Sequence, residues 1–218
     1  MDRSRIGLVI PAYNEAGTIY AVVKASSEYG TPIVVNDCSS DATANVAEQA
    51  GAIVVNHHRN LGYDGALNSG FAKAYTLGFD LIITLDADGQ HDPKLLLGFI
   101  DCIDLGADLV LGVRDKRPRV AEHIFALYTK ARYGIDDPLC GMKAYRRSIY
   151  ERLGHFDSYS SIGTELMLFG ARNNLQFKQV KFAVKDRQDS PRFGRRLSAN
   201  LRIFRSMLRD ISDFFKPQ

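Results

Sequence analysis

Two aspartates one residue apart, Asp86 and Asp88, form the pattern with the clearest chemistry in this sequence. They follow an apolar run at residues 81–85 and precede a Gln-His-Asp-Pro turn, so they lie on a short loop after a predicted strand. Two carboxylates on one loop can bind a hard cation, and Mg²⁺ or Mn²⁺ completes such an oxygen shell with water and phosphate oxygens. The pair therefore indicates a site for a cation that holds a phosphorylated substrate.

Polar residues follow three further predicted strands in the same way, at residues 11–15, 36–41 and 60–62. Each segment alone is typical of a helix N-terminus, because Asn, Asp and Ser cap helices. Ligands of α/β sheets bind beyond the carboxyl ends of the strands, however, so four polar strand ends should meet at one crevice. Together they favour a nucleotide pocket.

The elements that must position these residues alternate along the chain. Short apolar runs predict strands at residues 7–11, 32–36, 52–56, 81–86, 108–113 and 177–184. Helical segments are predicted between them, at residues 14 or 17 to 29, 40–50, 62–77 and 93–103, and another opens at Glu165. This order predicts an α/β fold built from βαβ units.

The four strand-end segments resemble the successive motifs of family 2 glycosyltransferases. The similarity is greatest to the branch of dolichol-phosphate mannose synthases and polyprenyl-phosphate glycosyltransferases. It implies the GT-A (nucleotide-diphospho-sugar transferase) fold, with a Rossmann-like, mainly parallel sheet flanked by helices. It also implies inverting transfer from a UDP- or GDP-sugar donor, preferably to a lipid phosphate, the polyprenyl phosphate.

The resemblance assigns roles to individual residues. It implies that the base and ribose are lined by Pro11, Tyr13 and Glu15 and that the base is contacted by Asp37. The same nucleotide pocket would be shaped by Asp41 and Gly62, and the Mg²⁺ or Mn²⁺ ligands would be Asp86, Asp88 and Gln90. The second motif departs from the family at Asn36, where relatives usually carry aspartate.

The second half of the chain should bind the acceptor. By the resemblance, Arg114 presents a guanidinium to phosphate, and Arg187 lies on a loop that closes over the donor. By the same resemblance, Glu165 would act as general base if the acceptor were a glycan hydroxyl, which must lose its proton as it attacks. A polyprenyl phosphate is already an anion. Alternatively, Glu165 is only a favourable charge in the first turn of a helix.

The 218 residues suit one catalytic domain, at residues 1–194, followed by a basic helix at 195–218. Residues 185–209 carry eight basic and two acidic side chains, although the whole chain has a net charge of only +3. Apolar residues at spacings of three and four, including Leu201, Phe204, Leu208 and Ile211, predict an amphipathic helix. Such a helix would contact an anionic membrane, pack on the domain, or join a twin subunit in a homodimer.

Composition and motifs exclude several other classes. We expect a cytoplasmic protein, with or without peripheral contact with the inner face of the cell membrane, because no signal peptide or long apolar stretch is present. Three separated cysteines predict neither disulfides nor a zinc site. A dinucleotide oxidoreductase would need a Gly-x-Gly-x-x-Gly turn, and no nucleic-acid partner is expected. A non-catalytic nucleotide-sugar-binding scaffold remains the alternative from another class.

Overall fold

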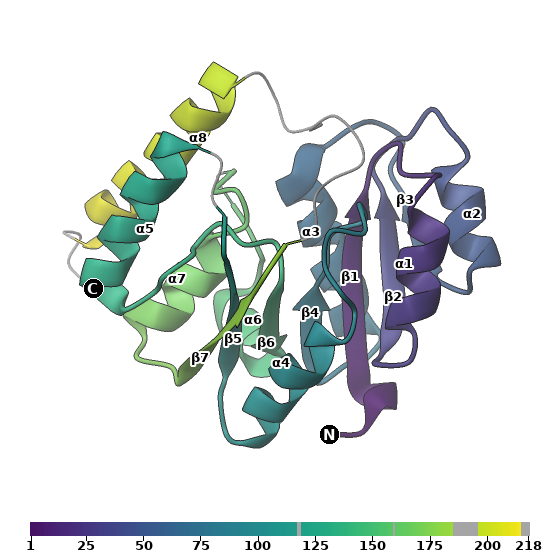
Figure 1. Cartoon of the computed structure of the whole chain (residues 1–218), viewed down its shortest axis with the longest axis horizontal. Helices are drawn as coiled ribbons and strands as arrows, with labels where there is room; N and C mark the ends of the chain where they lie inside the picture. Colours follow the sequence, from purple (N-terminus) through teal and green to yellow (C-terminus); the bar gives the residue numbers. More distant parts are fainter. Residues whose placement is uncertain (117–118, 159, 185–195, 215–218) are drawn as a thin grey trace.

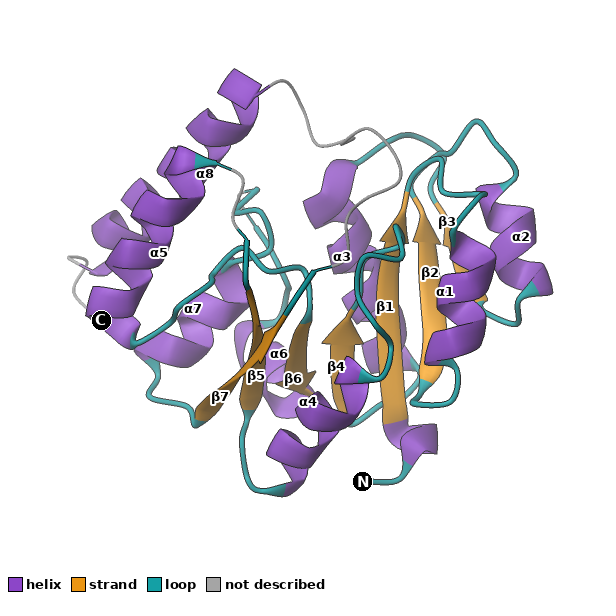
Figure 2. Ribbon diagram, viewed as in Figure 1, coloured by secondary structure: helices purple, strands orange, loops and turns teal. Residues whose placement is uncertain are grey.

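The strands form one seven-stranded sheet in the order β3-β2-β1-β4-β6-β5-β7 (Figure 2). The computed structural model describes the chain except residues 117–118, 159, 185–195 and 215–218 (Figure 1). The strands are β1 (Ile6–Ala12), β2 (Thr31–Asn36), β3 (Ile53–Asn56), β4 (Leu81–Thr84), β5 (Leu109–Arg114), β6 (Lys143–Arg146) and β7 (Phe177–Phe182). Only β6 runs antiparallel to its neighbours, β4 and β5, so the mainly parallel sheet predicted from the sequence is confirmed.

Helices cover both faces of the sheet (Figure 1). They are α1 (Ile19–Ser26), α2 (Thr43–Gln49), α3 (Gly62–Thr76), α4 (Leu95–Asp104), α5 (Val120–Tyr133), α6 (Arg147–Leu153), α7 (Glu165–Arg172) and α8 (Arg196–Phe214), with a 3₁₀ turn at Arg3–Arg5. All helices expected from the sequence are present, whereas α5, α6 and β6 were not predicted. No helix in the described part of the chain combines the length and apolar character that spanning a bilayer requires.

The core has two layers because successive residues of a strand point to opposite faces. On β1, Leu8 and Ile10 pack with α1, α2 and α4, whereas Val9 packs with α3 and the helices of the second half. The α3 backbone approaches the sheet closely at Gly70, where an added Cβ would lie 2.2 Å from Val9 Cγ1. Close packing of α3 fixes the position of its N-terminus, which lies at the edge of the sheet where the predicted site residues gather.

The C-terminal helix α8 packs beside α5 (Figure 1). Its buried residues are Ile203, Ser206 and Asp210, and Asp210 accepts hydrogen bonds from the hydroxyls of Tyr128 (2.7 Å) and Tyr133 (3.0 Å). The apolar stripe expected from the sequence is only partly the packed face: Phe204 packs against the core, whereas Leu201 and Leu208 remain 70% and 61% exposed. Burial of Asp210 is stabilised by its ion pair with Arg172 of α7.

Candidate active site

The carboxyl ends of β1, β2, β3 and β4 lie at one edge of the sheet, because these four strands are adjacent and parallel (Figure 2). The residues that the sequence assigned to the nucleotide and the metal lie at these strand ends or shortly after them, with Pro11 still on β1 and Gly62 at the start of α3. This spatial grouping was predicted from the strand ends. The structure adds how each loop is held.

The loops after β1 and β2 are tied together by hydrogen bonds. The Asn14 amide donates to Ser39 Oγ (2.9 Å), and Asn14 Oδ1 accepts from the Ser40 amide (2.8 Å). Asp41 accepts from the Ala16 amide (3.1 Å) with one carboxylate oxygen. Asn14 has φ +56°, a left-handed conformation that Asn tolerates better than most residues. Asp41, predicted to shape the nucleotide pocket, thus holds the β1 loop through its own side chain.

The predicted base-binding residues of the β1 loop differ in exposure. Tyr13 is 42% exposed, so its ring is accessible for stacking. Glu15 is buried, and its carboxylate accepts a hydrogen bond from the Thr18 hydroxyl (3.0 Å). Pro11 lies on β1 one residue before its end. Their contact with base and ribose stays a prediction.

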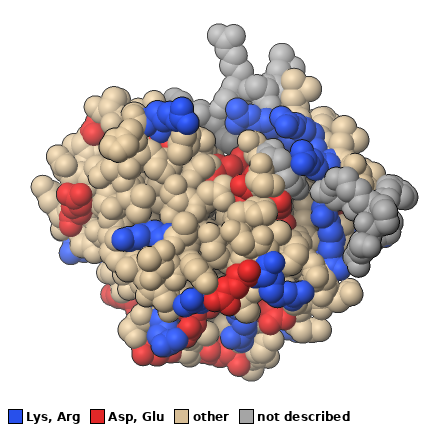
Figure 3. All heavy atoms as spheres, turned by 180° about the vertical axis from the view of Figure 1, so that it is seen from behind, with Lys and Arg blue, Asp and Glu red and all other residues tan. Residues whose placement is uncertain are grey.

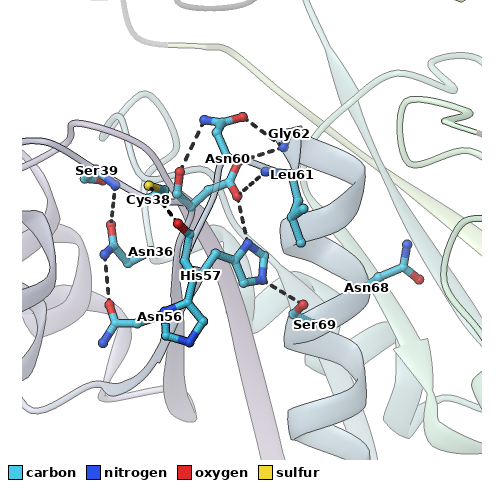
Figure 4. A network of polar contacts seen from close by, with 12 residues as sticks. Asn36, Cys38, Ser39, Asn56, His57, Asn60, Leu61, Gly62, Asn68 and Ser69 are labelled. Atoms are coloured by element: carbon cyan, nitrogen blue, oxygen red, sulfur yellow. Dashed lines mark hydrogen bonds and ion pairs between the residues drawn. The ribbon is translucent and has the colours of Figure 1, made fainter.

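Asp37 bonds with residues of a polar network between β2, β3 and α3. Figure 4 shows its partners His57, Leu61 and Gly62 in this network. Its carboxylate accepts hydrogen bonds from the backbone amides of Leu61 (2.7 Å) and Gly62 (2.8 Å). His57 lies between Asp37 Oδ1 and Ser69 Oγ, at 2.7 and 2.8 Å from its two ring nitrogens. Both oxygens of Asp37 therefore bind within the protein, where they fix the start of α3 and the position of Gly62. The resemblance assigned Asp37 to the base, and its contact with His57 had no signal in the sequence.

The loop with Asp86 and Asp88 follows β4. Asp88 Oδ1 accepts a hydrogen bond from the Gln90 amide (3.1 Å), which folds the loop. The Asp86 carboxylate lies against the backbone of Gly141, where an added Cβ would be 2.3 Å from Oδ2. On another side lies His91, whose Nδ1 is 3.8 Å from Asp86 Oδ2.

The residues of this loop suit a divalent cation bound together with a substrate. Their side-chain donors are oxygens, as Mg²⁺ and Mn²⁺ prefer. The backbone of Gly141 leaves no space for a side chain beside the Asp86 carboxylate, and His91 Nδ1 is buried with no hydrogen-bond partner among the described residues. No three His, Cys, Asp or Glu side chains in the described ranges converge to hold an ion. A cation at Asp86 and Asp88 would therefore need Gln90, water or substrate oxygens as further ligands.

Arg114, at the end of β5, binds two carboxylates. Its guanidinium donates to Asp137 through Nε (2.8 Å) and Nη2 (3.0 Å) and to Glu122 (3.2 Å). Burial alone would lower the pKa of Arg114, but the hydrogen bonds and charge of Asp137 raise it instead. Arg114 lies at an open surface pocket that it lines with Asp115, Lys181 and neighbouring apolar residues of β5 and β7. Its predicted contact with phosphate is untested. Arg187 lies outside the described residues.

Glu165 is the first residue of α7, as the sequence predicted. Its carboxylate accepts hydrogen bonds from the Ser158 hydroxyl (2.8 Å) and amide and contacts His155 Nε2 (3.0 Å). The side chain is only 14% exposed. Glu165 therefore ties the loop before α7 to the start of that helix.

A group of buried and partly buried charges between β6, α3 and the loop before α7 was not predicted from the sequence. Lys143 of β6 donates from Nζ to the Gly163 carbonyl (2.8 Å), and burial lowers its pKa to about 8. Asp64 of α3 accepts from the Gly163 amide (2.8 Å). Burial, and then the negative charge of Asp157, raise the pKa of Asp64 to about 6. These residues join β6 and α3 to the loop before α7.

The raised pKa of Asp64 predicts a pH-dependent stability difference. The Asp64 carboxyl keeps its proton up to about pH 6 in the folded protein but loses it near pH 3.8 in the unfolded chain. Proton binding by Asp64 therefore stabilises the folded state fully below pH 3.8, and this contribution to the free energy of unfolding is lost as pH rises through 6. Asp64→Asn cannot ionise. Urea denaturation should therefore show the variant gaining stability relative to wild type between pH 4.5 and 7.5. A constant difference would contradict the assignment, and Asp101→Asn, at an exposed position of α4, serves as the control.

Comparison with known proteins identifies the family. Residues 8–154 match the family model for glycosyl transferase family 2. The UDP-N-acetylglucosamine–dolichyl-phosphate N-acetylglucosaminyltransferase of Methanococcus voltae is 27% identical, over 93% of this chain and 94% of that enzyme. The undecaprenyl-phosphate 4-deoxy-4-formamido-L-arabinose transferase of Proteus mirabilis is 33% identical, over 86% of this chain and 62% of that enzyme.

Solved structures agree on the fold. Glucosyl-3-phosphoglycerate synthase from Mycobacterium tuberculosis, in complex with Mn²⁺, UDP-glucose and phosphoglyceric acid, aligns with a TM-score of 0.77 at 21% identity. The alignment covers 97% of this chain and 80% of that one. The GT-A architecture expected from the sequence is thereby confirmed. With the family model covering more than half of its length, the chain belongs to glycosyl transferase family 2.

Proposed function

We propose that this glycosyltransferase moves a sugar from a UDP- or GDP-sugar to a polyprenyl phosphate with inversion at the anomeric carbon. The observation that carries the proposal is an Asp86/Asp88 loop, on the nucleotide edge of the sheet, in a chain whose relatives transfer sugars to dolichyl and undecaprenyl phosphates. In the proposed reaction, a phosphate oxygen of the acceptor forms the new bond to the anomeric carbon. The bond to the nucleoside diphosphate breaks in the same step.

The proposed site residues divide into those that hold the donor and those that hold the cation. Tyr13 is accessible to a base, and the Gly62 amide is held in place by Asp37. Asp86, Asp88 and Gln90 would hold Mg²⁺ or Mn²⁺, which when bound supplies positive charge to the departing diphosphate. The protein then has to position donor and acceptor and exclude water, which is the larger part of its contribution.

The contacts of Glu165 favour a phosphate acceptor over a saccharide hydroxyl. A hydroxyl acceptor needs a base, but the carboxylate of Glu165 already accepts from Ser158 and contacts His155. A phosphate oxygen is ionised at neutral pH and needs none. In the proposed reaction Glu165 shapes the acceptor side of the site by ordering the loop before α7.

The experiment that tests the proposal has two steps. Calorimetry with UDP- and GDP-sugars, with and without Mn²⁺, should identify one donor whose binding requires the metal. That donor, labelled in its sugar, should then transfer the label to a short-chain polyprenyl phosphate and not to a saccharide hydroxyl. Failure of every donor to bind would refute the donor assignment, and transfer to a hydroxyl alone would refute the acceptor.

We also propose that α5 and α8 contact an anionic membrane surface at its cytoplasmic side. Exposed apolar side chains on the two packed helices include Val120 and Leu127 of α5 (73% and 71%) and Leu201 and Leu208 of α8. On α8 they alternate with the exposed side chains of Arg202, Arg205 and Arg209. Basic side chains gather over the part of the surface where α8 lies (Figure 3). Apolar insertion combined with attraction to anionic lipids would bring the site to a lipid-linked acceptor.

The double variant Leu201→Ser/Leu208→Ser should weaken binding to phosphatidylglycerol vesicles at least tenfold in co-sedimentation, because two large apolar side chains no longer enter the lipid. Leu105→Ser, at an 85% exposed position after α4, should leave binding unchanged. Equal binding by all three proteins would contradict the proposal. So would a wild-type dimer, seen by light scattering, that the double variant converts to a monomer, because a twin subunit would then cover these leucines.

A further inference from the structure

His91 presents a buried polar atom that nothing in the described fold uses. Its side chain is only 4% exposed, and Nδ1 has no hydrogen-bond partner among the described residues. The ring packs against Phe182 of β7, with centroids 5.4 Å apart and planes at 88°. Leaving such an atom unpaired costs about 1–3 kcal/mol, so a protein rarely keeps one without use.

The carboxylate of Asp86 lies close to this atom, with 3.8 Å between Nδ1 and Oδ2. A hydrogen bond between nitrogen and oxygen requires roughly 2.7–3.2 Å, so a shift of less than about 1 Å would close the gap. The Gly141 backbone lies so close to the Asp86 carboxylate that a Cβ added at Gly141 would be 2.5 Å from Oδ1. The carboxylate therefore has no room to move toward Gly141. The Asp86 carboxylate therefore lies between the Gly141 backbone and the Nδ1 atom of His91.

We propose that His91 is a positioning residue that donates a hydrogen bond from Nδ1 to Asp86 and sets the orientation of that carboxylate when a divalent cation binds. The inference rests on the proposed function, because it needs a cation at Asp86 and Asp88. A carboxylate held from behind presents its remaining lone pairs in one direction, and such supporting hydrogen bonds are worth 10- to 100-fold in metal affinity. Packing of the ring against Phe182 holds the imidazole in place.

The test is the affinity for Mn²⁺ in the presence of UDP or GDP, measured by electron paramagnetic resonance of the free ion. His91→Phe removes the donor but keeps a ring against Phe182, and it should weaken Mn²⁺ binding about tenfold. His91→Asn places an amide nitrogen near the position of Nδ1 and should restore the affinity to within about threefold of wild type. His58→Asn, at an exposed position after β3, is the matched control and should bind Mn²⁺ as wild type does.

The outcomes separate this inference from the proposed function. If the wild-type protein binds no Mn²⁺ with either nucleotide, the proposed function itself fails. If wild type binds Mn²⁺ and His91→Phe binds equally well, the positioning role is wrong. Nitrogen modulation in the pulsed resonance spectrum of the wild-type complex would also overturn it, because His91 would then ligate the ion directly.

Discussion

Replacing Asp88 with asparagine should reduce the rate of sugar transfer about 1,000-fold, equivalent to roughly 4 kcal/mol of transition-state stabilisation. Asparagine has nearly the same shape, and its amide oxygen can still accept the hydrogen bond from the Gln90 amide. The loop should therefore keep its conformation while the negative charge is lost. Steady-state kinetics at saturating donor and Mn²⁺ measure the effect, and thermal unfolding shows whether the fold is unchanged.

Asp92→Asn is the matched control for this prediction because Asp92 lies on the same loop. Its carboxylate accepts from the Lys94 amide (3.0 Å), close to the start of α4, and an asparagine there can keep that contact. The control variant should retain activity within a few-fold of wild type. If Asp88→Asn also stayed within tenfold of wild type, a metal role for this carboxylate would be untenable.

The sequence predicted the first half of the sheet well because β1 to β4 are continuous apolar runs whose local pattern is sufficient. It did not predict β6, whose four residues, Lys-Ala-Tyr-Arg, include two long basic side chains. Pairing explains why this short segment is a strand. It is antiparallel to both β4 and β5, and Lys143 lies opposite Thr84, whose hydroxyl accepts from the Lys143 amide (3.0 Å). Such contacts join residues far apart in the chain and leave no periodic signal.

The candidate site was predictable in position but not in its internal contacts. Strand ends placed Tyr13, Asp37 and Asp86 at one edge of the sheet, and the topology confirms that grouping. What Asp37 binds depends on the path of the chain after β3, which brings His57 and the Leu61 amide to it. An aspartate that caps a neighbouring helix and one that binds a base have the same local sequence.

The same limit applies to Arg114, which the sequence assigned to phosphate. Asp137 is 23 residues away in sequence, on a segment between α5 and β6, so no local pattern revealed that it pairs with Arg114. With its guanidinium held by Asp137 and Glu122, Arg114 is oriented before any ligand arrives. The two carboxylates partly neutralise the positive charge of the Arg114 guanidinium, but they also fix its orientation. This explains why Asp137, rather than the arginine alone, should govern the stability of this region.

Asp137→Asn should lower the free energy of unfolding by about 3 kcal/mol, because it leaves the charge of Arg114 in a largely buried position with one partner fewer. The Asp137 side chain is 1% exposed, and it accepts from the backbone amide of Arg114 (3.1 Å) as well as from the guanidinium. Urea denaturation followed by circular dichroism measures the loss, provided that the slope of the transition is unchanged.

The neighbouring residue supplies a close control for this prediction. Asp136 pairs with Lys130 at 3.0 Å, but that lysine is 66% exposed, so water solvates the pair. Asp136→Asn should therefore cost less than about 1 kcal/mol. The two variants remove the same charge from adjacent positions and differ mainly in the burial of the cation left behind. If Asp137→Asn also lost less than about 1 kcal/mol of unfolding free energy, Asp137 would not be the main partner that compensates the charge of Arg114, and Glu122 alone would suffice.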